Sequence, residues 1–139
     1  MSFSFNPDKT DFSRYSLALF SEGNVVFAST HSGLQPLILC VYSCKDLYTD
    51  CVLHDKAIGF AAARLLAYSG IASLVRTRVI SAPARHLLSR QGMEIHAEQE
   101  VENFLTRDGL RLSPMEERAL KAADNEAFYR EMERLFRPK

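Results

Sequence analysis

Charged and hydroxyl side chains recur where helices are expected to begin, and such positions suit the binding of a small ligand. Asp55 and Lys56 open an alanine-rich run, while Ser113 stands just before a proline and Ser81 stands two residues before one. Helix N-termini carry unpaired N–H groups and a partial positive charge, so with Lys56 they favour an anionic or strongly hydrogen-bond-accepting group. Asp55 and Lys56 are also the candidates for a catalytic role. The predicted ligand-binding residues are Asp55, Lys56, Ser81, Ser113, Glu116, Ser32 and Gly33.

Each of these residues also has a purely structural interpretation. Asp55 suits an N-cap, which is worth about 1 kcal/mol, and Ser113-Pro114-Met115-Glu116 is typical of a capping box. Lys56 would oppose the helix dipole unless Asp55, Glu116 or an anionic ligand offset its charge. Lys56 therefore separates two hypotheses. Burial of Lys56 against Glu116 favours a scaffold, whereas a cavity lined by Lys56 and Asp55 favours a binding site.

Zinc chemistry of the deaminase type is not expected. A zinc deaminase begins one helix with a His or Cys ligand and a Glu, and the next helix with Pro-Cys-x-x-Cys. Here the corresponding helices begin with Asp55-Lys56 and Ser81-Ala82-Pro83-Ala84. The triplet His96-Ala97-Glu98 repeats part of the signature but follows a different strand.

A second metal candidate combines the cysteines with one histidine. Cys40 and Cys44 are one helical turn apart, and Cys51 and His54 form only a loose second pair for a structural zinc site. The alternative is that the cysteines are small core residues with free thiols. We predict neither a metal nor a cofactor.

The composition is that of one globular domain without an overall charge. The 139 residues include 17 Lys and Arg and 17 Asp and Glu, and 47% are hydrophobic. Nucleic acid is therefore not an expected partner, despite a local basic stretch at Arg76, Arg78, Arg85 and Arg90. The sequence contains neither a signal peptide pattern nor an apolar run of the roughly 20 residues that span a membrane. We expect a cytoplasmic protein.

The order of elements that would position these residues predicts a single α/β domain, 1–139. Residues 1–6 are expected to form a loose tail, and 125–139 a C-terminal helix whose apolar face packs on the core or joins a homodimer. A hairpin that feeds into alternating helices and strands favours a mixed sheet. The remaining helices are predicted over 7–15, 34–47, 55–69, 81–90 and from 113, and the strands over 16–21, 25–29, 71–80 and 93–95.

Four motifs in order point to a known family. Residues 55–63 read Asp-Lys-x-x-Gly-x-Ala-Ala-Ala, and Gly33-Leu34-Gln35-Pro36-Leu37, Ser81-Ala82-Pro83-Ala84 and Ser113-Pro114-Met115-Glu116 complete the set. Over about Tyr15 to Leu120 the chain resembles a family of small bacterial proteins with a cytidine-deaminase-like fold. The resemblance implies a three-layer α/β/α mixed sheet without the zinc site.

The resemblance also bears on function. The family usually has Cys-Pro-x-Glu where this chain has Ser113, so a thiol nucleophile is not carried over. By analogy of fold, the ligand is expected to be nucleoside-like or amide-like, and the helix starts with Lys56 favour a small anionic group. A metal-independent enzyme is compatible with these residues, but a zinc-dependent cytidine deaminase is not. The alternative is a non-catalytic binding or interaction scaffold.

Overall fold

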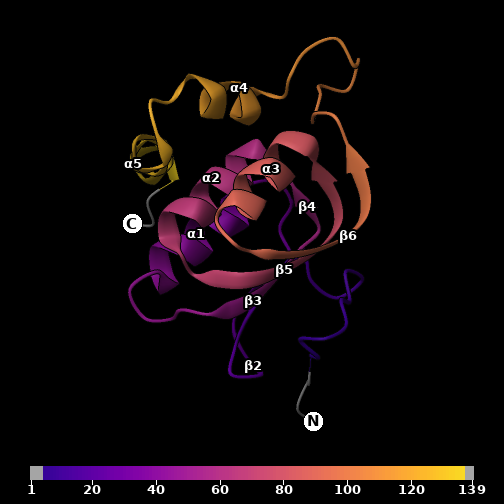
Figure 1. Ribbon diagram of the computed structural model, residues 1–139, viewed down its shortest axis with the longest axis vertical. Coiled ribbons are helices and arrows are strands. Elements are labelled where there is room, and N and C mark those ends of the chain that lie inside the picture. The colour runs from indigo at the N-terminus through magenta and orange to yellow at the C-terminus, as the bar shows by residue number, and fades with distance from the viewer. Residues whose placement is uncertain (1–4, 137–139) are drawn as a thin grey trace.

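A six-stranded mixed sheet with helices against it organises residues 5–136, which the computed structural model describes (Figure 1). The strands are β1 (Leu17–Ser21), β2 (Asn24–Ser29), β3 (Cys51–Asp55), β4 (Ala57–Ile58), β5 (Ala72–Ser81) and β6 (Glu94–Val101). The helices are α1 (Gln35–Cys44), α2 (Phe60–Ser69), α3 (Ala82–Arg90), α4 (Pro114–Lys121) and α5 (Asn125–Phe136). The predicted α/β class with a mixed sheet is confirmed.

The sheet joins an antiparallel hairpin to a parallel set of strands. β1 pairs antiparallel with both β2 and β3, and β5 pairs parallel with β3, β4 and β6. The predicted hairpin turns at Glu22 and Gly23, whose φ values of 52° and 83° suit the turn that a right-twisted hairpin requires. β6 runs the length of β5, so β3 and β4 share the other edge of β5. Lys56 interrupts that edge, and its N–H binds the carbonyl oxygen of Ser16 at 3.0 Å.

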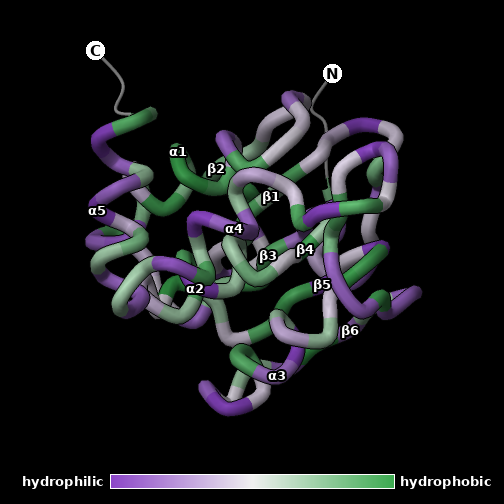
Figure 2. The backbone as a smooth tube through the Cα atoms, turned by 90° about the horizontal axis from the view of Figure 1, so that it is seen from above, coloured by the Kyte–Doolittle hydropathy of each residue, from purple (hydrophilic) through white to green (hydrophobic). Residues whose placement is uncertain are grey.

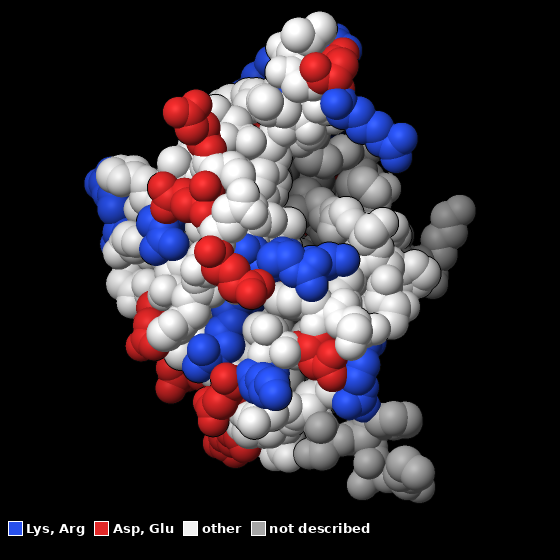
Figure 3. Space-filling model, turned by 90° about the vertical axis from the view of Figure 1, so that its right-hand side faces the viewer, with Lys and Arg blue, Asp and Glu red and all other residues white. Residues whose placement is uncertain are grey.

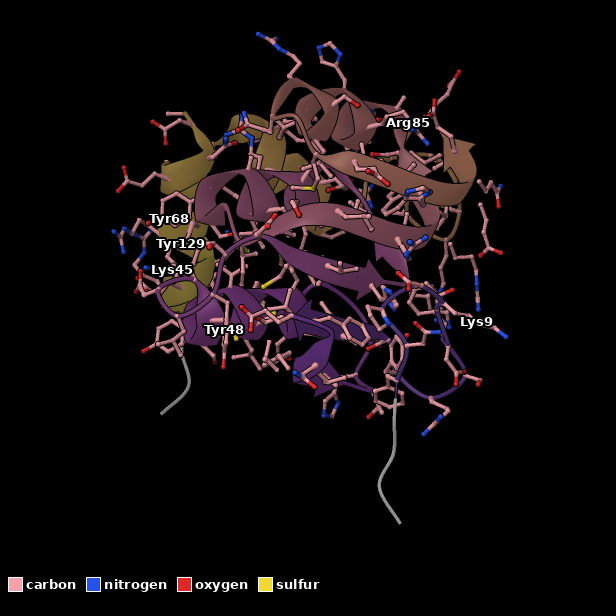
Figure 4. All side chains as sticks on the ribbon, turned by 60° about the horizontal axis from the view of Figure 1, so that its bottom comes forward. Lys9, Lys45, Tyr48, Tyr68, Arg85 and Tyr129 are labelled. Atoms are coloured by element: carbon pink, nitrogen blue, oxygen red, sulfur yellow. The ribbon has the colours of Figure 1, made fainter. Side chains whose placement is uncertain are left out.

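Alternation along the strands gives the sheet two different faces. Leu19 and Leu53 belong to the main core beneath the helices, whereas Ala18 and Phe20 belong to a smaller core on the opposite face. Helices α1, α2 and α3 pack side by side on the first face, and α4 and α5 lie over α2 (Figure 1). α5 is anchored by Tyr129, whose ring stacks on Tyr68 with centroids 4.7 Å apart (Figure 4).

Hydropathy follows this layering. The inner elements α1 and β1 are largely hydrophobic, whereas α5 alternates between hydrophilic and hydrophobic residues (Figure 2). Such alternation is expected of an outer helix that buries one side. Within residues 5–136, no helix combines the length and the apolar character needed to cross a membrane.

The predicted helix over 7–15 is wrong, because the segment forms turns on the second face of the sheet. Its backbone is bound by side chains of the sheet. The carbonyl oxygen of Pro7 lies 2.8 Å from Nε2 of His54 and accepts a 3.1 Å hydrogen bond from Nε of Arg76. Of the tail predicted at 1–6, residues 1–4 lie outside the described chain, and Phe5 packs edge-on against Tyr15 with ring centroids 4.9 Å apart.

The predicted and the observed element boundaries differ most at the start of α2. The sequence pattern predicts a helix from Asp55, but β3 continues through Asp55 and α2 begins at Phe60 with Gly59 as its N-cap residue. The assignment of Asp55 as an N-cap is therefore wrong. At the other end, Gly70 closes the helix with φ 62°, as its type predicts. α5 covers residues 125–136 of the helix expected at 125–139, and 137–139 lie outside the described residues.

Candidate ligand-binding site

A cavity of about 730 Å³ lies where β3 ends and where helices α1, α2 and α4 begin. Most of the side chains that line it are uncharged. The space-filling view shows a hollow in the surface with Lys and Arg side chains near its edge (Figure 3). Six of the seven predicted ligand-binding residues line it: Ser32, Gly33, Asp55, Lys56, Ser113 and Glu116. The structure therefore brings together residues that are up to 84 positions apart in the chain (116 minus 32).

Asp55 occupies the wall of this cavity at the carboxyl end of β3. It exposes only part of its surface, and within residues 5–136 it forms no ion pair and no hydrogen bond with another side chain. Burial raises the pKa of Asp55 to about 8, against the opposing effect of the N–H groups of Ala57 and Lys56. The carboxyl group is thus protonated over much of the neutral range.

Lys56 lies beside Asp55 and is exposed to the same cavity. No carboxylate of the described residues lies within ion-pairing distance of its ammonium group. The other basic side chains at the cavity have neighbours. Arg78 stacks over the ring of Phe12 at 5.7 Å, and Arg14 is 3.6 Å from the carboxylate of Asp11.

Glu116 has a role that differs from the predicted one. Its two carboxylate oxygens accept hydrogen bonds from the N–H groups of Phe60 at 2.8 Å and Ala61 at 2.6 Å. Glu116 is only 6% exposed, and burial raises its pKa while these two N–H groups lower it. The side chain of α4 therefore caps the N-terminus of α2, and the capping-box assignment within residues 113–116 is wrong. Two of the α2 N–H groups that were expected to bind a ligand, those of Phe60 and Ala61, therefore already have a partner.

Gly59 makes this contact between α4 and α2 possible. A Cβ atom at Gly59 would overlap the Glu116 carboxylate and lie 2.7 Å from the ring of Phe104. Its φ of −97° is open to any residue, so close approach and not backbone conformation requires glycine here. Gly59 therefore packs closely against α4 at the start of α2, and not inside a helix as the predicted range of 55–69 would place it.

The two predicted serine caps behave differently. Ser81 accepts a hydrogen bond from the N–H of Ala84 at 3.3 Å and so caps α3, as its position predicts. It is 1% exposed and does not line the cavity. Ser113 precedes α4 and lines the cavity, but its side chain forms no capping hydrogen bond.

The structure does not assemble the cysteines and His54 into a metal site. Cys51 and His54 are three residues apart in β3, which places their side chains on opposite faces of the sheet. His54 is held by Tyr15, whose hydroxyl lies 2.7 Å from Nδ1. Within residues 5–136, no three His, Cys, Asp or Glu side chains are grouped so as to hold a metal ion.

Further residues of the cavity have no signal in the sequence motifs. Phe104 lies in the connection between β6 and α4, and Phe12 lies in the segment that was predicted to be helical. Arg78 stands out only as part of the basic stretch. These three side chains reach the cavity through tertiary packing, which local patterns do not encode.

Comparison with known proteins places the chain in a defined group. The sequence profile of the TM1506 family, described as a domain of unknown function (DUF1893), matches residues 9–136. The crystal structure of a DUF1893 family protein (TM1506) from Thermotoga maritima is similar, with a TM-score of 0.77 and 26% sequence identity over 89% of this chain and 82% of that one. No curated protein matches the chain.

Proposed function

Because this chain belongs to the DUF1893 family, whose description states no activity, we propose a function from the site itself: the cavity at Asp55 and Lys56 binds a small organic ligand that carries an anionic group and is of nucleoside-like size. The observation that carries the proposal is the ammonium group of Lys56, which pairs with no carboxylate of residues 5–136 and lies in the same cavity as Asp55. The volume of about 730 Å³ lies within the range of small-molecule sites.

The cavity offers different surroundings to the two parts of such a ligand. Lys56 and Arg78 supply positive charge for the anionic group. Phe104, Ala62 and Val79 supply apolar walls for the remainder of the molecule. The N-termini of α2 and α3 contribute less than the sequence suggests, because Glu116 and Ser81 occupy their N–H groups.

A cytidine-deaminase-like arrangement belongs to the same proposal. An antiparallel hairpin followed by the parallel strands β3, β5 and β6, with helices in the crossovers, supports it. In open α/β sheets, ligands bind outside the carboxyl ends of the strands. Asp55 and Lys56 stand at such an end.

The test is a thermal-shift screen with inorganic phosphate, benzoate and nucleoside monophosphates on the parent protein, Lys56→Ala and Lys121→Ala. Lys121 lies in the last turn of α4 and does not line the cavity, so it controls for the loss of one positive charge. We expect at least one probe to stabilise the parent and the Lys121 variant but not the Lys56 variant. Stabilisation that is equal in all proteins would move the site elsewhere, and the absence of any hit would favour the scaffold hypothesis.

A further inference from the structure

We propose that Asp55 selects ligands with a planar edge on which an N–H donor stands beside an acceptor, as in neutral amides and amino-substituted azine rings. This inference rests on the proposed function, since it specifies the chemistry of the part of the ligand that meets Asp55. It does not depend on which anionic group meets Lys56.

The first support is the place of Asp55 in the fold. Asp55 has the same parity along β3 as Cys51 and Leu53, which lie in the main core, so its side chain is on the helix-bearing face of the sheet. At Asp55 the main core ends and the cavity begins. Among the described residues no side chain binds the carboxyl group, which leaves its outer edge available to a ligand.

The second support is the set of charges around Asp55. The other titratable groups that line the cavity are Tyr15, Arg14, His31, Lys56, Arg78 and Glu116. Glu116 is bound to α2 and Arg14 to Asp11, so the cation adjacent to Asp55 is Lys56, which is exposed. Desolvation outweighs the hydrogen bonds from the N–H groups of Ala57 and Lys56 and raises the pKa of Asp55 to about 8, so the carboxyl group is protonated at neutral pH.

A protonated carboxyl group has a defined hydrogen-bonding pattern. Its O–H donates and its carbonyl oxygen accepts, whereas an ionised carboxylate only accepts. An amide or an amino-azine edge presents the complementary pair, so that two parallel hydrogen bonds form without the transfer of a charge into the cavity. The nearby apolar walls, Ala62 and Val79 among them, suit the ring that would bear such an edge.

The experiment uses three probes that share a benzene ring and differ only in the edge. Benzamide is neutral with a donor and an acceptor, benzamidinium is a cation with donors only, and benzoate is an anion with acceptors only. Dissociation constants are measured by ligand-observed NMR at about pH 6 and about pH 9.5, which lie on either side of the Asp55 transition. We expect benzamide to bind at least about tenfold more tightly than benzamidinium at the lower pH, and this preference to fall or reverse at the higher pH.

Two variants assign the preference to Asp55. Asp55→Asn keeps a donor and an acceptor in the same plane, so benzamide binding should be retained but should no longer depend on pH. Asp55→Leu removes both groups, so benzamide binding should weaken about tenfold while benzoate binding through Lys56 persists. Asp46→Asn, which changes an exposed carboxyl group outside the cavity, should leave the preference and its pH dependence unchanged. The pH arm on the parent protein tests the inference even if the leucine variant does not fold.

The outcomes separate this inference from the proposed function. A parent protein that prefers benzamidinium at about pH 6, or a leucine variant that binds benzamide as the parent does, would overturn the role of Asp55. If anionic probes still depend on Lys56 in that case, the proposed function stands. If no probe of either set binds, both proposals fail.

Discussion

Two carboxyl groups in the wall of the same cavity differ in the elements that bind them. The carboxylate of Glu116 receives two backbone hydrogen bonds at the start of α2, and these offset part of the cost of its burial. Among the described residues, the N–H groups of Ala57 and Lys56 from its own segment oppose the desolvation of Asp55. The first carboxylate is structural, and the second remains available to a ligand. This contrast gives Asp55 a measurable effect on stability.

Asp55→Asn should change how stability depends on pH. Burial raises the pKa of Asp55 from its ordinary 3.8 to about 8, so the folded protein retains a proton that the unfolded chain releases. The stability that this proton contributes is complete below about pH 4 and is lost as pH rises through about 8. Relative to the parent, the free energy of unfolding of the asparagine variant should therefore increase over this interval, as measured by urea denaturation at several pH values.

The control for this prediction is Asp46→Asn, because the Asp46 side chain is 83% exposed. Its difference from the parent should be nearly independent of pH over the same interval. A flat difference for Asp55→Asn as well would show that Asp55 is ionised in the folded protein throughout the neutral range.

At the scale of elements, the helices obtain their N-terminal hydrogen bonds from different sources. α3 uses the residue that precedes it, Ser81, whereas α2 uses Glu116 from α4. α4 itself receives no cap from the side chain of Ser113. The side chains of these two serines are therefore expected to contribute differently to the free energy of unfolding.

Replacement of each serine by alanine should reveal this difference. Ser81→Ala should lower the free energy of unfolding by about 1 kcal/mol, because the buried cap of α3 is lost. Ser113→Ala should change it by less than about 0.5 kcal/mol. Midpoints of urea denaturation measure both, and an equal loss in the two variants would contradict the assignment of the caps.

The contact between Gly59 and Glu116 should appear as energetic coupling. Gly59→Ala should cost about 1–3 kcal/mol through overlap with the carboxylate, and Glu116→Ala should cost a similar amount through the loss of hydrogen bonds to Phe60 and Ala61. The double variant should lose less than the sum, because removal of Glu116 makes room for the new methyl group. A parallel cycle with the exposed Glu117 should be additive. Additivity in both cycles would mean that Gly59 and Glu116 do not compete for space.

The parts of the fold that follow from local chemistry could be predicted, and the parts that depend on distant contacts could not. The hairpin turn at Gly23 and the C-cap at Gly70 follow from residue type. The start of α2 could not be located, because its cap is provided 55 residues further along the chain. β6 was predicted too short, since its Glu-Ile-His-Ala-Glu-Gln-Glu-Val sequence places charges on an edge strand with little apolar signal.

The same distinction applies to the site. Asp55, Lys56 and the small residues Ser32 and Gly33 could be identified from motifs. Ser81 does not belong with them, although it too stands at the start of a helix. In the structure the cavity lies at the starts of α1, α2 and α4, and Ser81 caps α3 outside it.

At the scale of the whole molecule, the sheet is covered by helices on one side and by the N-terminal segment on the other. His54 connects the segment to the sheet, since its ring binds the carbonyl of Pro7 and the hydroxyl of Tyr15. Burial lowers the pKa of His54 and keeps the ring neutral, so Nε2 donates to Pro7 and Nδ1 accepts from Tyr15. Tyr15 also lines the cavity, so the two sides of the sheet meet at this residue.

Tyr15→Phe should therefore loosen the N-terminal segment. The change leaves Nδ1 of a buried histidine without a donor, at a cost of about 1–3 kcal/mol in the free energy of unfolding. We expect limited trypsin digestion to cut after Lys9 faster than in the parent, as followed by mass spectrometry. Tyr42→Phe, at a residue that is 39% exposed, is the control and should leave the cleavage rate unchanged. Equal protection of Lys9 in both variants would show that other contacts hold the segment.

The Glu116 cap also has a consequence for the order in which the protein is made. Ala61 leaves the ribosome 55 residues before Glu116 does, which corresponds to roughly 3 to 11 seconds of synthesis. During that interval the first turn of α2 has no partner for its N–H groups, although the strands on which it packs are already forming. The cavity acquires its final wall only when α4 arrives. A chain that ends before residue 116 therefore contains every strand of the sheet but lacks this wall of the cavity.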